Sequence, residues 1–324
     1  MTASREIKEP GRGRIRVQVP ATTANLGPGF DCLGMALDIW NQVEVELSSA
    51  PLVRVDGKGG TDLPSGPQNL VYRSIVHLLE HVGVEPPPLS VACTNNIPLK
   101  RGLGSSAAAI VGGLTAGNRL VPILSGGRVQ SLSPEEVLQL AVAIEGHPDN
   151  VAPALMGGMV LVVQGNDGLL TSAVPVPEDL RAVLYIPDLT IATEDARSVL
   201  PEGIAWEDAV FNMGRTALLV NAMNTGRLED LSTATEDKLH QPYRRQLFPA
   251  MKVIFEGAMK GGALGVFLSG SGPTILALRH GREVTVAYEM AEAARQASVP
   301  GEVKVTRPVS TGTICSWHEE AGAG

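Results

Sequence analysis

Hydrophobic and polar residues follow two different spacings along the chain, and these predict strands in some segments and helices in others. Apolar residues alternate with polar ones over residues 14–19 and again over residues 41–47, which is the period of a half-buried strand. Short apolar runs bounded by turn-forming residues also predict strands. These runs cover residues 89–94, 159–163, 183–186, 263–268 and 274–278.

Apolar residues three and four positions apart predict helices in several segments. The clearest start signal is Ser133, which is followed by Pro134 and, three positions after the serine, by Glu136. This combination is typical of a helix N-terminus, and Gly146 and Pro148 are expected to end the same helix. The predicted helices cover residues 69–82, 107–120, 135–145, 206–224 and 248–259.

The order of these elements favours a layered α+β architecture over a strictly alternating parallel sheet, because the long helices are interleaved irregularly with the strands. The segment QGNDG, residues 164–168, interrupts two strand-like runs. We therefore expect two domains, residues 14–168 and residues 169–315. Residues 21–34, between the first two strands, are expected to form a loop because Gly and Pro are frequent there, and loops of this kind often bind ligands.

Composition and charge narrow the class of protein. The chain has 44% hydrophobic and 19% charged residues, which is too apolar for a disordered chain. Its 26 Lys and Arg against 34 Asp and Glu give a net charge of -8, which argues against a nucleic-acid surface. Three cysteines favour a reducing compartment over a disulfide framework. Residues 1–10 lack the apolar core of a signal peptide, and the uncharged residues 261–278 are rich in Gly, so we expect a cytoplasmic protein without a membrane span.

The segment PLKRGLGSSAA, residues 98–108, combines glycines, two hydroxyls and an expected helix start. Gly102 and Gly104 allow the backbone to approach a ligand closely, and the free N–H groups of a helix N-terminus bind phosphate. Ser105 and Ser106 offer hydroxyls to a phosphate or to Mg²⁺. The alternative is an ordinary turn that caps a helix of small residues. The segment is neither a Walker A loop nor GxGxxG, and protein-kinase signatures are missing.

The segment EGHPDNVAP, residues 145–153, places two carboxylates, an imidazole and a carboxamide close together at a helix end. A Mg²⁺ ion that arrives with a nucleotide usually takes one or two protein oxygens besides the phosphates, and Glu145 with Ser106 would supply them. The alternative is a solvated helix end with Pro148 as its stop signal. His147 has no second His or Cys at zinc-ligand spacing, so no zinc site is predicted.

Three segments, in this order along the chain, resemble the three motifs of the GHMP small-molecule kinases. They are PATTANLGPGFD (residues 20–31), PLKRGLGSSAA and LSGSGP (residues 268–273). Within that superfamily, NLGPGFD and EGHPDNVAP resemble the homoserine kinase family, and the likeness runs over about residues 14–313. It implies a two-domain α+β GHMP kinase fold, with an N-terminal domain similar to ribosomal protein S5 domain 2 and a ferredoxin-like C-terminal domain. It also implies transfer of the ATP γ-phosphoryl group to L-homoserine in threonine biosynthesis, by a homodimer.

The resemblance also implies roles for individual residues. ATP is the expected phosphoryl donor with Mg²⁺ as cofactor, and Asn69 is expected near the adenine. The expected ATP-binding residues are Asn69, Pro98, Leu99, Lys100, Arg101, Gly102, Leu103, Gly104, Ser105, Ser106, Ala107 and Ala108. Ser106 and Glu145 are expected to hold the metal ion, and together with Asn150 they form the catalytic set. Homoserine is expected to meet Asn25, Asp31, His147, Thr193, Arg197 and Arg244.

The chemistry of an amino acid fits these residue types without reference to the family. A carboxylate such as Asp31 can pair with an α-ammonium group, and a guanidinium can hold an α-carboxylate through two parallel hydrogen bonds. Arg244 and Arg245 are adjacent, and the sequence leaves open which of them contacts the ligand. The pair Thr22-Thr23 stands where the family commonly has two serines, a change that keeps both hydroxyls.

Several related kinases have an aspartate base at the position that aligns with Asn150. A carboxamide cannot take a proton from the attacking hydroxyl at neutral pH. Phosphoryl transfer depends mainly on positioning and charge stabilisation. Our hypothesis is that the hydroxyl attacks without a dedicated carboxylate base.

Three other interpretations remain. A GHMP kinase acting on mevalonate or a sugar keeps the fold, but mevalonate has no ammonium group to pair with Asp31. A catalytically silent ligand sensor keeps the fold for protein contacts, but both expected metal ligands, Ser106 and Glu145, are present. A dinucleotide-binding oxidoreductase is disfavoured because the glycine loop lies about 100 residues from the start and lacks the third glycine.

Overall fold

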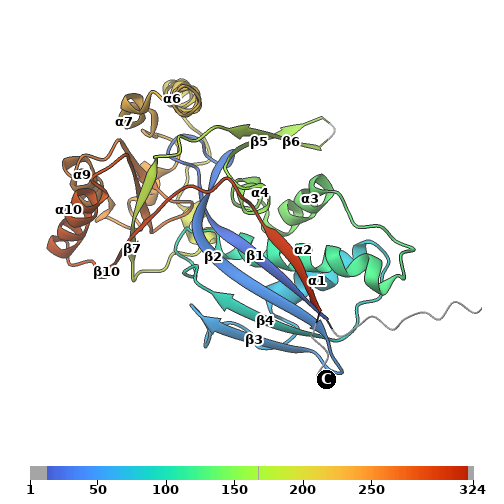
Figure 1. Ribbon diagram of the computed structural model, residues 1–324. Coiled ribbons are helices and arrows are strands. Elements are labelled where there is room, and N and C mark those ends of the chain that lie inside the picture. Colours follow the sequence, from blue (N-terminus) through green and yellow to red (C-terminus); the bar gives the residue numbers. More distant parts are fainter. Residues whose placement is uncertain (1–12, 167, 320–324) are drawn as a thin grey trace, which may run out of the picture.

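The first layer of the fold is a seven-stranded sheet in which strands from both ends of the chain lie side by side (Figure 1). The computed structural model describes residues 13–166 and 168–319, and residues 1–10, for which no signal peptide is expected, lie outside this range. The C-terminal strand pairs antiparallel with the N-terminal one. The strands are β1 (Gly13–Ala24), β2 (Leu33–Leu47), β3 (Leu52–Gly57), β4 (Leu89–Asn95), β5 (Met159–Gly165), β6 (Gly168–Val174) and β11 (Ile314–Glu319).

The long strand β2 organises this sheet. Its second half alternates buried and partly exposed residues, as its sequence predicts, and pairs with β1 and β4. Its first half also pairs with β1 and turns to β5 on the other side. The loop expected over residues 21–34 is therefore too long: β1 continues to Ala24 and β2 begins at Leu33. Thr22 and Thr23 are buried in the ladder opposite Ala36 and Met35, a pairing that local composition does not reveal.

Four helices pack beside this sheet, and Figure 1 shows them gathered on one side of it. They are α1 (Leu70–His81), α2 (Ser105–Leu124), α3 (Pro134–Glu145) and α4 (Pro148–Met156). The predicted start of α3 is confirmed, because the Ser133 side chain accepts from the Glu136 N–H and the Glu136 carboxylate accepts from the Ser133 N–H. Pro148 does more than end α3, since it also occupies the first turn of α4, a position that suits proline.

Helix α2 lies between α1 and the strands β1 and β2. Among the described residues it is the one helix long and apolar enough to cross a membrane, as judged by length and composition. However, 61% of its apolar 18-residue stretch is buried inside the protein. Its buried residues belong to the main hydrophobic core. The apolar composition of α2 is therefore explained by its burial, because a helix that is covered on several sides needs few polar residues.

The second sheet has four antiparallel strands in the order β10-β7-β9-β8. In chain order these are the fourth, first, third and second strands of a β-α-β-β-α-β unit, which is the ferredoxin-like arrangement. Helices α9 and α10 pack on it. The strands and these helices are β7 (Arg181–Pro187), β8 (Gly265–Leu268), β9 (Ile275–Arg279), β10 (Gly301–Thr306), α9 (Met251–Lys260) and α10 (Glu283–Gln296).

One long helix and several short ones follow β7 in the second unit, and two of the short helices border the candidate site. They are α5 (Thr193–Ser198), α6 (Trp206–Thr225), η1 (Leu228–Asp230), α7 (Leu231–Ala234) and α8 (Gln241–Arg244). The sequence predicted α6 and α9 but not the short helices α5 and α8. Helices of four to six residues carry too few apolar positions to show a period.

One hydrophobic core extends from the first unit, the seven-stranded sheet with α1–α4, to the second unit, the four-stranded sheet with its helices. A further core lies between the second sheet and helices α9 and α10. Along β7, Val183 and Tyr185 pack with the core of α9 and α10, whereas Ala182, Leu184 and Ile186 belong to the core of the first unit. Both faces of this strand are therefore buried, as expected for a sheet between two layers. The consequence is that side chains from the two units are held in fixed positions relative to one another.

Strand pairing does not follow the domain division expected from the sequence. On either side of the interruption, β5 and β6 pair antiparallel with one another, from Met159 with Val174 to Gly165 with Gly168. Strand β6 therefore belongs to the first sheet, and so does β11 at the far end of the chain. A division after residue 168 would place nearly all of β6 in a different domain from its partner β5.

Candidate active site

The glycine and serine segment connects β4 to α2 and ends at a helix N-terminus without a side-chain cap. Gly104 is the N-cap, with φ of 71°, and a Cβ there would lie 1.9 Å from the Thr22 hydroxyl oxygen. Within the described structure, no acceptor meets the backbone N–H of Ser105, Ser106 or Ala107. Free amides at the positive end of a 20-residue helix form an anion site.

The third motif holds this segment in place from the second unit. The Ser269 hydroxyl lies 2.6 Å from the Gly102 carbonyl oxygen and 2.8 Å from the Thr23 hydroxyl. The Thr274 N–H donates to the Arg101 carbonyl oxygen over 3.3 Å. Gly102 has φ of 71°, and a Cβ there would lie 2.1 Å from the Ser269 carbonyl oxygen. All three motifs therefore meet at one point, where the glycine permits the close approach.

Ser106 and Glu145 lie together at the start of α2 and the end of α3. The Ser106 hydroxyl donates to Glu145 Oε2 over 2.7 Å. Burial raises the pKa of the Glu145 carboxyl above its usual 4.5, so a cation beside it would favour the ionised form. The described residues contain no group of three or more His, Cys, Asp or Glu that could hold a metal ion. The donor set is thus two protein oxygens, which suits Mg²⁺ bound to a nucleotide.

Three polar side chains at the junction of α3 and α4, those of His147, Asp149 and Asn150, are connected by hydrogen bonds. His147 Nδ1 donates to Asp149 Oδ1 over 2.9 Å, and Asn150 Nδ2 lies 3.3 Å from the same oxygen. Asn150 Oδ1 accepts from the Thr22 hydroxyl over 2.8 Å. The bond to Asp149 raises the pKa of His147 above its usual 6.5. Both amide atoms of Asn150 are therefore engaged with the protein.

Asp31 and Arg197 form a bidentate ion pair across the cavity. Arg197 Nη1 and Nη2 donate to the two Asp31 oxygens over 3.0 and 2.7 Å. Asn25 supports this loop, because its Oδ1 accepts from the Asp31 N–H over 3.0 Å and its Nδ2 donates to the Gly270 carbonyl oxygen over 3.0 Å. Asn25 and Asp31 both have positive φ, which places the two side chains at a tight turn.

Arg244 is the buried guanidinium of the site, with 3% exposure. Its Nε donates to the Ala196 carbonyl oxygen over 3.2 Å, and its Nη1 donates to the Gly270 carbonyl oxygen over 2.9 Å. Burial and the charge of Arg197 lower the pKa of Arg244 to about 10. The neighbouring Arg245 is exposed and does not line the cavity. Of the two adjacent arginines, the structure therefore places Arg244 and not Arg245 at the cavity.

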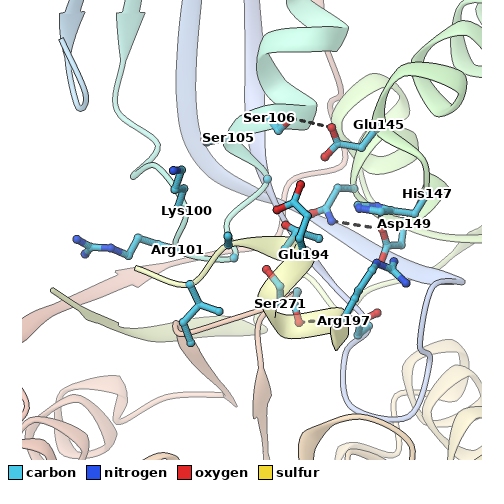
Figure 2. Close-up of a pocket in the computed structure, with 18 of the residues that line it drawn as sticks. Lys100, Arg101, Ser105, Ser106, Glu145, His147, Asp149, Glu194, Arg197 and Ser271 are labelled. Carbon is cyan, nitrogen blue, oxygen red and sulfur yellow. Dashed lines mark hydrogen bonds and ion pairs between the residues drawn. The ribbon is translucent and has the colours of Figure 1, made fainter. Parts of the chain in front are cut away.

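These groups border one cavity of about 360 Å³. Figure 2 shows Ser106 with Glu145 at one end and Arg197 at the other, while Lys100 and Arg101 lie across from His147 and Asp149. Thr193 and Glu194, at the start of α5, also face it. The cavity brings together most of the expected site residues, namely Asn25, Asp31, Lys100, Arg101, Gly102, Gly104, Ser105, Ser106, Glu145, His147, Asn150, Thr193, Arg197 and Arg244.

Some expected ATP-binding residues do not line this cavity. Asn69 is the N-cap of α1, where its Oδ1 accepts from the Val71 N–H and its Nδ2 donates to the Pro64 carbonyl oxygen, both over 3.0 Å. The other residues outside the cavity lining belong to the glycine segment itself and are Pro98, Leu99, Leu103, Ala107 and Ala108. The side chains of Leu103, Ala107 and Ala108 are buried in the core, whereas the backbone N–H of Ala107 is one of the free amides at the start of α2.

Two segments of the chain match known domains of one superfamily. Residues 69–158 match the GHMP kinases N terminal domain, and residues 218–296 match the GHMP kinases C terminal domain. A homoserine kinase of Moorella thermoacetica is 44% identical over 298 residues, which cover 92% of this chain and 98% of that protein. The chain belongs to the homoserine kinase family. Another member, from Thermosynechococcus vestitus, is 47% identical over 263 residues, or 81% of this chain and 85% of that protein.

Solved structures agree with membership of the homoserine kinase family. A homoserine kinase from Cytophaga hutchinsonii superposes with a TM-score of 0.81 at 31% identity, and the match covers 98% of this chain and all of that one. A solved mevalonate kinase matches with a TM-score of 0.65 at 14% identity, which shows a shared fold alone. The α+β GHMP kinase fold expected from the three motifs is confirmed.

Several residues of the site had no expected role. Asp149 and Glu194 line the cavity, and both lie inside polar segments that the sequence had already singled out. His240 and Asp237 lie behind Arg244. His240 contacts Gly27, 213 positions away, and Asp237 contacts Asn212, 25 positions away, and no local pattern predicts these two contacts. Phe30 has the guanidinium groups of Arg197 and Arg244 near its ring, and its place in a motif was the only feature of the sequence that pointed to it.

Proposed function

We propose that this protein transfers the γ-phosphoryl group of ATP to the side-chain hydroxyl of L-homoserine and forms O-phospho-L-homoserine and ADP in threonine biosynthesis. One observation carries the proposal: a single cavity has free helix N-terminal amides on one side and the charges of Asp31, Arg197 and Arg244 on the other. An anion site beside one carboxylate and two guanidinium groups fits a nucleoside triphosphate next to a zwitterionic amino acid.

The Asp31–Arg197 pair favours an acceptor with both charges. Its two groups satisfy each other through two hydrogen bonds. An α-ammonium group can take the place of Arg197 beside Asp31, and an α-carboxylate can take the place of Asp31 beside Arg197. An alcohol with only one of these charges leaves a carboxylate or a guanidinium without its partner, which is costly in a partly buried site. Mevalonate has no ammonium group and is disfavoured for this reason.

The phosphate side fits Mg-ATP. The amides of residues 105–107 would meet phosphate oxygens, and Lys100 and Arg101 border the same part of the cavity. Ser106 and Glu145 are the residues that would hold Mg²⁺, and their oxygens are already 2.7 Å apart. The ion would neutralise part of the charge that develops on the transferred phosphoryl group.

We further propose that no carboxylate base is dedicated to the acceptor hydroxyl. Asn150 is engaged with Thr22 and Asp149 at its two amide atoms, and Asp149 is 2% exposed and accepts from His147. The hydroxyl proton leaves to a phosphate oxygen or to water, and alignment together with charge stabilisation provides the rate. Asp149→Asn should then lower kcat by about tenfold or less, the effect of one altered hydrogen bond. A loss of several orders of magnitude with nucleotide binding intact would falsify the base-free mechanism.

The acceptor is tested by ADP release in a coupled assay with Mg-ATP. L-Homoserine should give strong turnover, while L-serine, L-threonine, mevalonate and galactose should give little. The product should contain phosphate on the side-chain oxygen, as read by phosphorus NMR. Turnover of mevalonate in place of homoserine would assign the chain to another GHMP kinase activity. ATP binding without turnover of any acceptor would favour a ligand sensor.

Two further points are proposed, the first from the composition of the sequence and the second from the resemblance to the family. We expect the protein to act in the cytoplasm and as a homodimer. Light scattering coupled to size-exclusion chromatography tests the second point, because a dimer has twice the 34.0 kDa mass of the chain. A monomer that retains full turnover would contradict it.

A further inference from the structure

His240 is a fully buried side chain that bonds in two directions. Its Nε2 lies 2.7 Å from the Gly27 carbonyl oxygen, and its Nδ1 lies 3.1 Å from Arg244 Nη1. A carbonyl oxygen can only accept, so Nε2 carries the proton. A guanidinium can only donate, so Nδ1 offers its lone pair. The ring is therefore neutral, in agreement with a pKa that burial lowers to about 4.

Asp237 fixes the backbone that carries this ring. Its carboxylate accepts from the backbone N–H groups of Leu239, His240 and Gln241 over 2.9, 3.0 and 2.7 Å. Asn212 Nδ2, on α6, donates to the same carboxylate over 2.8 Å. A fully buried carboxylate with this many donors holds the segment before α8 in one conformation.

The result is a guanidinium with one free edge. Arg244 Nε donates to Ala196, and the two hydrogens of Nη1 go to Gly270 and to His240. Only Nη2 has no partner within the described structure, and Arg244 borders the cavity. A guanidinium has five N–H donors in a fixed plane, so three bonds to the protein decide which nitrogen faces a ligand.

The same imidazole ring also supports the loop that carries Asp31. Phe30 stacks on His240 with ring centroids 5.2 Å apart and an interplanar angle of 25°. The guanidinium carbons of Arg197 and Arg244 lie 5.6 and 5.3 Å from the Phe30 ring centre. His240 is thus the side chain that connects the Gly27–Phe30 part of the loop to Arg244.

We propose that His240 is a positioning residue for recognition of the acceptor carboxylate. It holds Arg244 so that Nη2 faces the cavity, at a fixed place relative to the Asp31 loop. The inference rests on the proposed function, because the α-carboxylate of the amino acid is the group that Nη2 would meet. His240 acts through Arg244 and does not contact the acceptor itself.

Two substitutions separate the two bonds of the ring. In His240→Asn, the amide oxygen stands close to the place of Nδ1 and can still accept from Arg244, while the bond to Gly27 is lost. In His240→Gln, the amide nitrogen stands close to the place of Nε2 and can still donate to Gly27, while the bond to Arg244 is lost. His240→Phe keeps the ring and loses both bonds. The Gln and Asn variants therefore compare loss of the hydrogen bond to Arg244 with loss of the hydrogen bond to the Gly27 carbonyl oxygen.

We expect His240→Gln and His240→Phe to raise the KM for homoserine about tenfold or more, the usual effect of a lost hydrogen bond to a charged group. His240→Asn should raise it clearly less. The KM for ATP should stay within about twofold of the wild-type value, since no bond of His240 reaches the phosphate side. His280→Gln, at an exposed position in the turn before α10, is the matched control and should change neither constant.

A double-mutant cycle with Arg244→Ala tests whether His240 acts through Arg244. In the Arg244→Ala background, His240→Gln should cause no further rise in the KM for homoserine. Additive effects would overturn the proposal, and so would equal KM values for the Asn and Gln variants. If every variant lost thermal stability and showed a raised KM for both homoserine and ATP, His240 would have a purely structural role. A wild-type enzyme without turnover of homoserine would refute the proposed function instead.

Discussion

The two sides of the cavity are built in different ways. The phosphate side consists mainly of backbone amides and hydroxyls from one continuous segment, residues 98–108, at the start of α2. The acceptor side consists of charged side chains from separate parts of the chain, among them Asp31, Arg197 and Arg244. A phosphate group is recognised by dipoles that a helix provides on its own, whereas an amino acid requires opposite charges at a set distance.

This difference affects how each side tolerates change. On the phosphate side, the positions of the amides are fixed by backbone conformation, so the sensitive residues are the glycines and the one acidic partner, Glu145. On the acceptor side, the positions of the charges depend on other side chains behind them, such as Asn25 and His240. We therefore expect substitutions on the first side to affect nucleotide use and those on the second to affect the acceptor.

Glu145→Gln should produce the largest loss, because it removes the charge that would hold the metal ion at the phosphate side. We expect kcat to fall about 100-fold or more, the magnitude found when charge stabilisation of a transition state is lost. The Mg²⁺ concentration for half-maximal rate should rise as well. Glu135→Gln, exposed in the first turn of the same helix, should leave both unchanged. A metal dependence equal to the wild type would contradict the assignment of Glu145.

Gly102→Ala should destabilise the fold at the contact between the glycine segment and the third motif. A Cβ at this position would lie 2.1 Å from the Ser269 carbonyl oxygen, and φ is positive. Strain and overpacking together should lower the free energy of unfolding by about 3 kcal/mol, as measured by urea denaturation. Gly126→Ala has positive φ but no neighbour within 4 Å, so it measures the strain alone. Equal losses for the two variants would show that the contact with Ser269 has no energetic weight.

Asp31→Asn should change only the acceptor side. It removes the charge that Arg197 pairs with and that an ammonium group would need. The KM for homoserine should rise about 10- to 100-fold, as for a lost charged hydrogen bond, and the KM for ATP should remain unchanged. Asp195→Asn, exposed on the same helix as Arg197, is the control. A rise in both KM values would mean that the two sides are not independent.

His147→Gln should give the smallest effect, and one that depends on pH. The folded-state pKa of His147 lies above its usual 6.5 because its ring donates a hydrogen bond to the Asp149 carboxylate. The bond therefore stabilises the fold fully below pH 6.5, and this contribution disappears as the pH rises through the folded-state pKa. The variant should be about 1 kcal/mol less stable than the wild type near pH 5.5, with a smaller difference near pH 9. A constant difference across this range would show that the charged form of His147 is not involved.

Much of the fold was predictable because its signals are local. The capping box of α3 and the period of α1 lie within a few residues. Two of the missed strands have a common cause. Strand β11 finds its partner about 300 positions away in β1, and β6 is recognised as a strand through its pairing with β5. Short strands of mixed polarity become strands because another strand lies beside them, which is a tertiary effect.

The candidate site divides in the same way. The polar residues of segments 98–108 and 145–153 were predicted to belong to the site, because several functional groups lie close together in each of these short segments. Asn69 was expected near the adenine. In the structure it caps α1 and lies outside this cavity, and its contact with the nucleotide stays a prediction. The choice of Arg244 over Arg245 required the structure, since adjacent residues on a helix point in different directions.

The sequence by itself determined the superfamily, the helix that carries the anion site and the kinds of charged groups available for an acceptor, because these depend on residue types at short spacings. Tertiary structure decided which charges face each other. The Asp31–Arg197 pair spans 166 positions, and the contact of His240 with Gly27 spans 213. A hydrogen bond needs its donor and acceptor within about 3 Å of each other, and only the packing of the two units brings such distant residues that close.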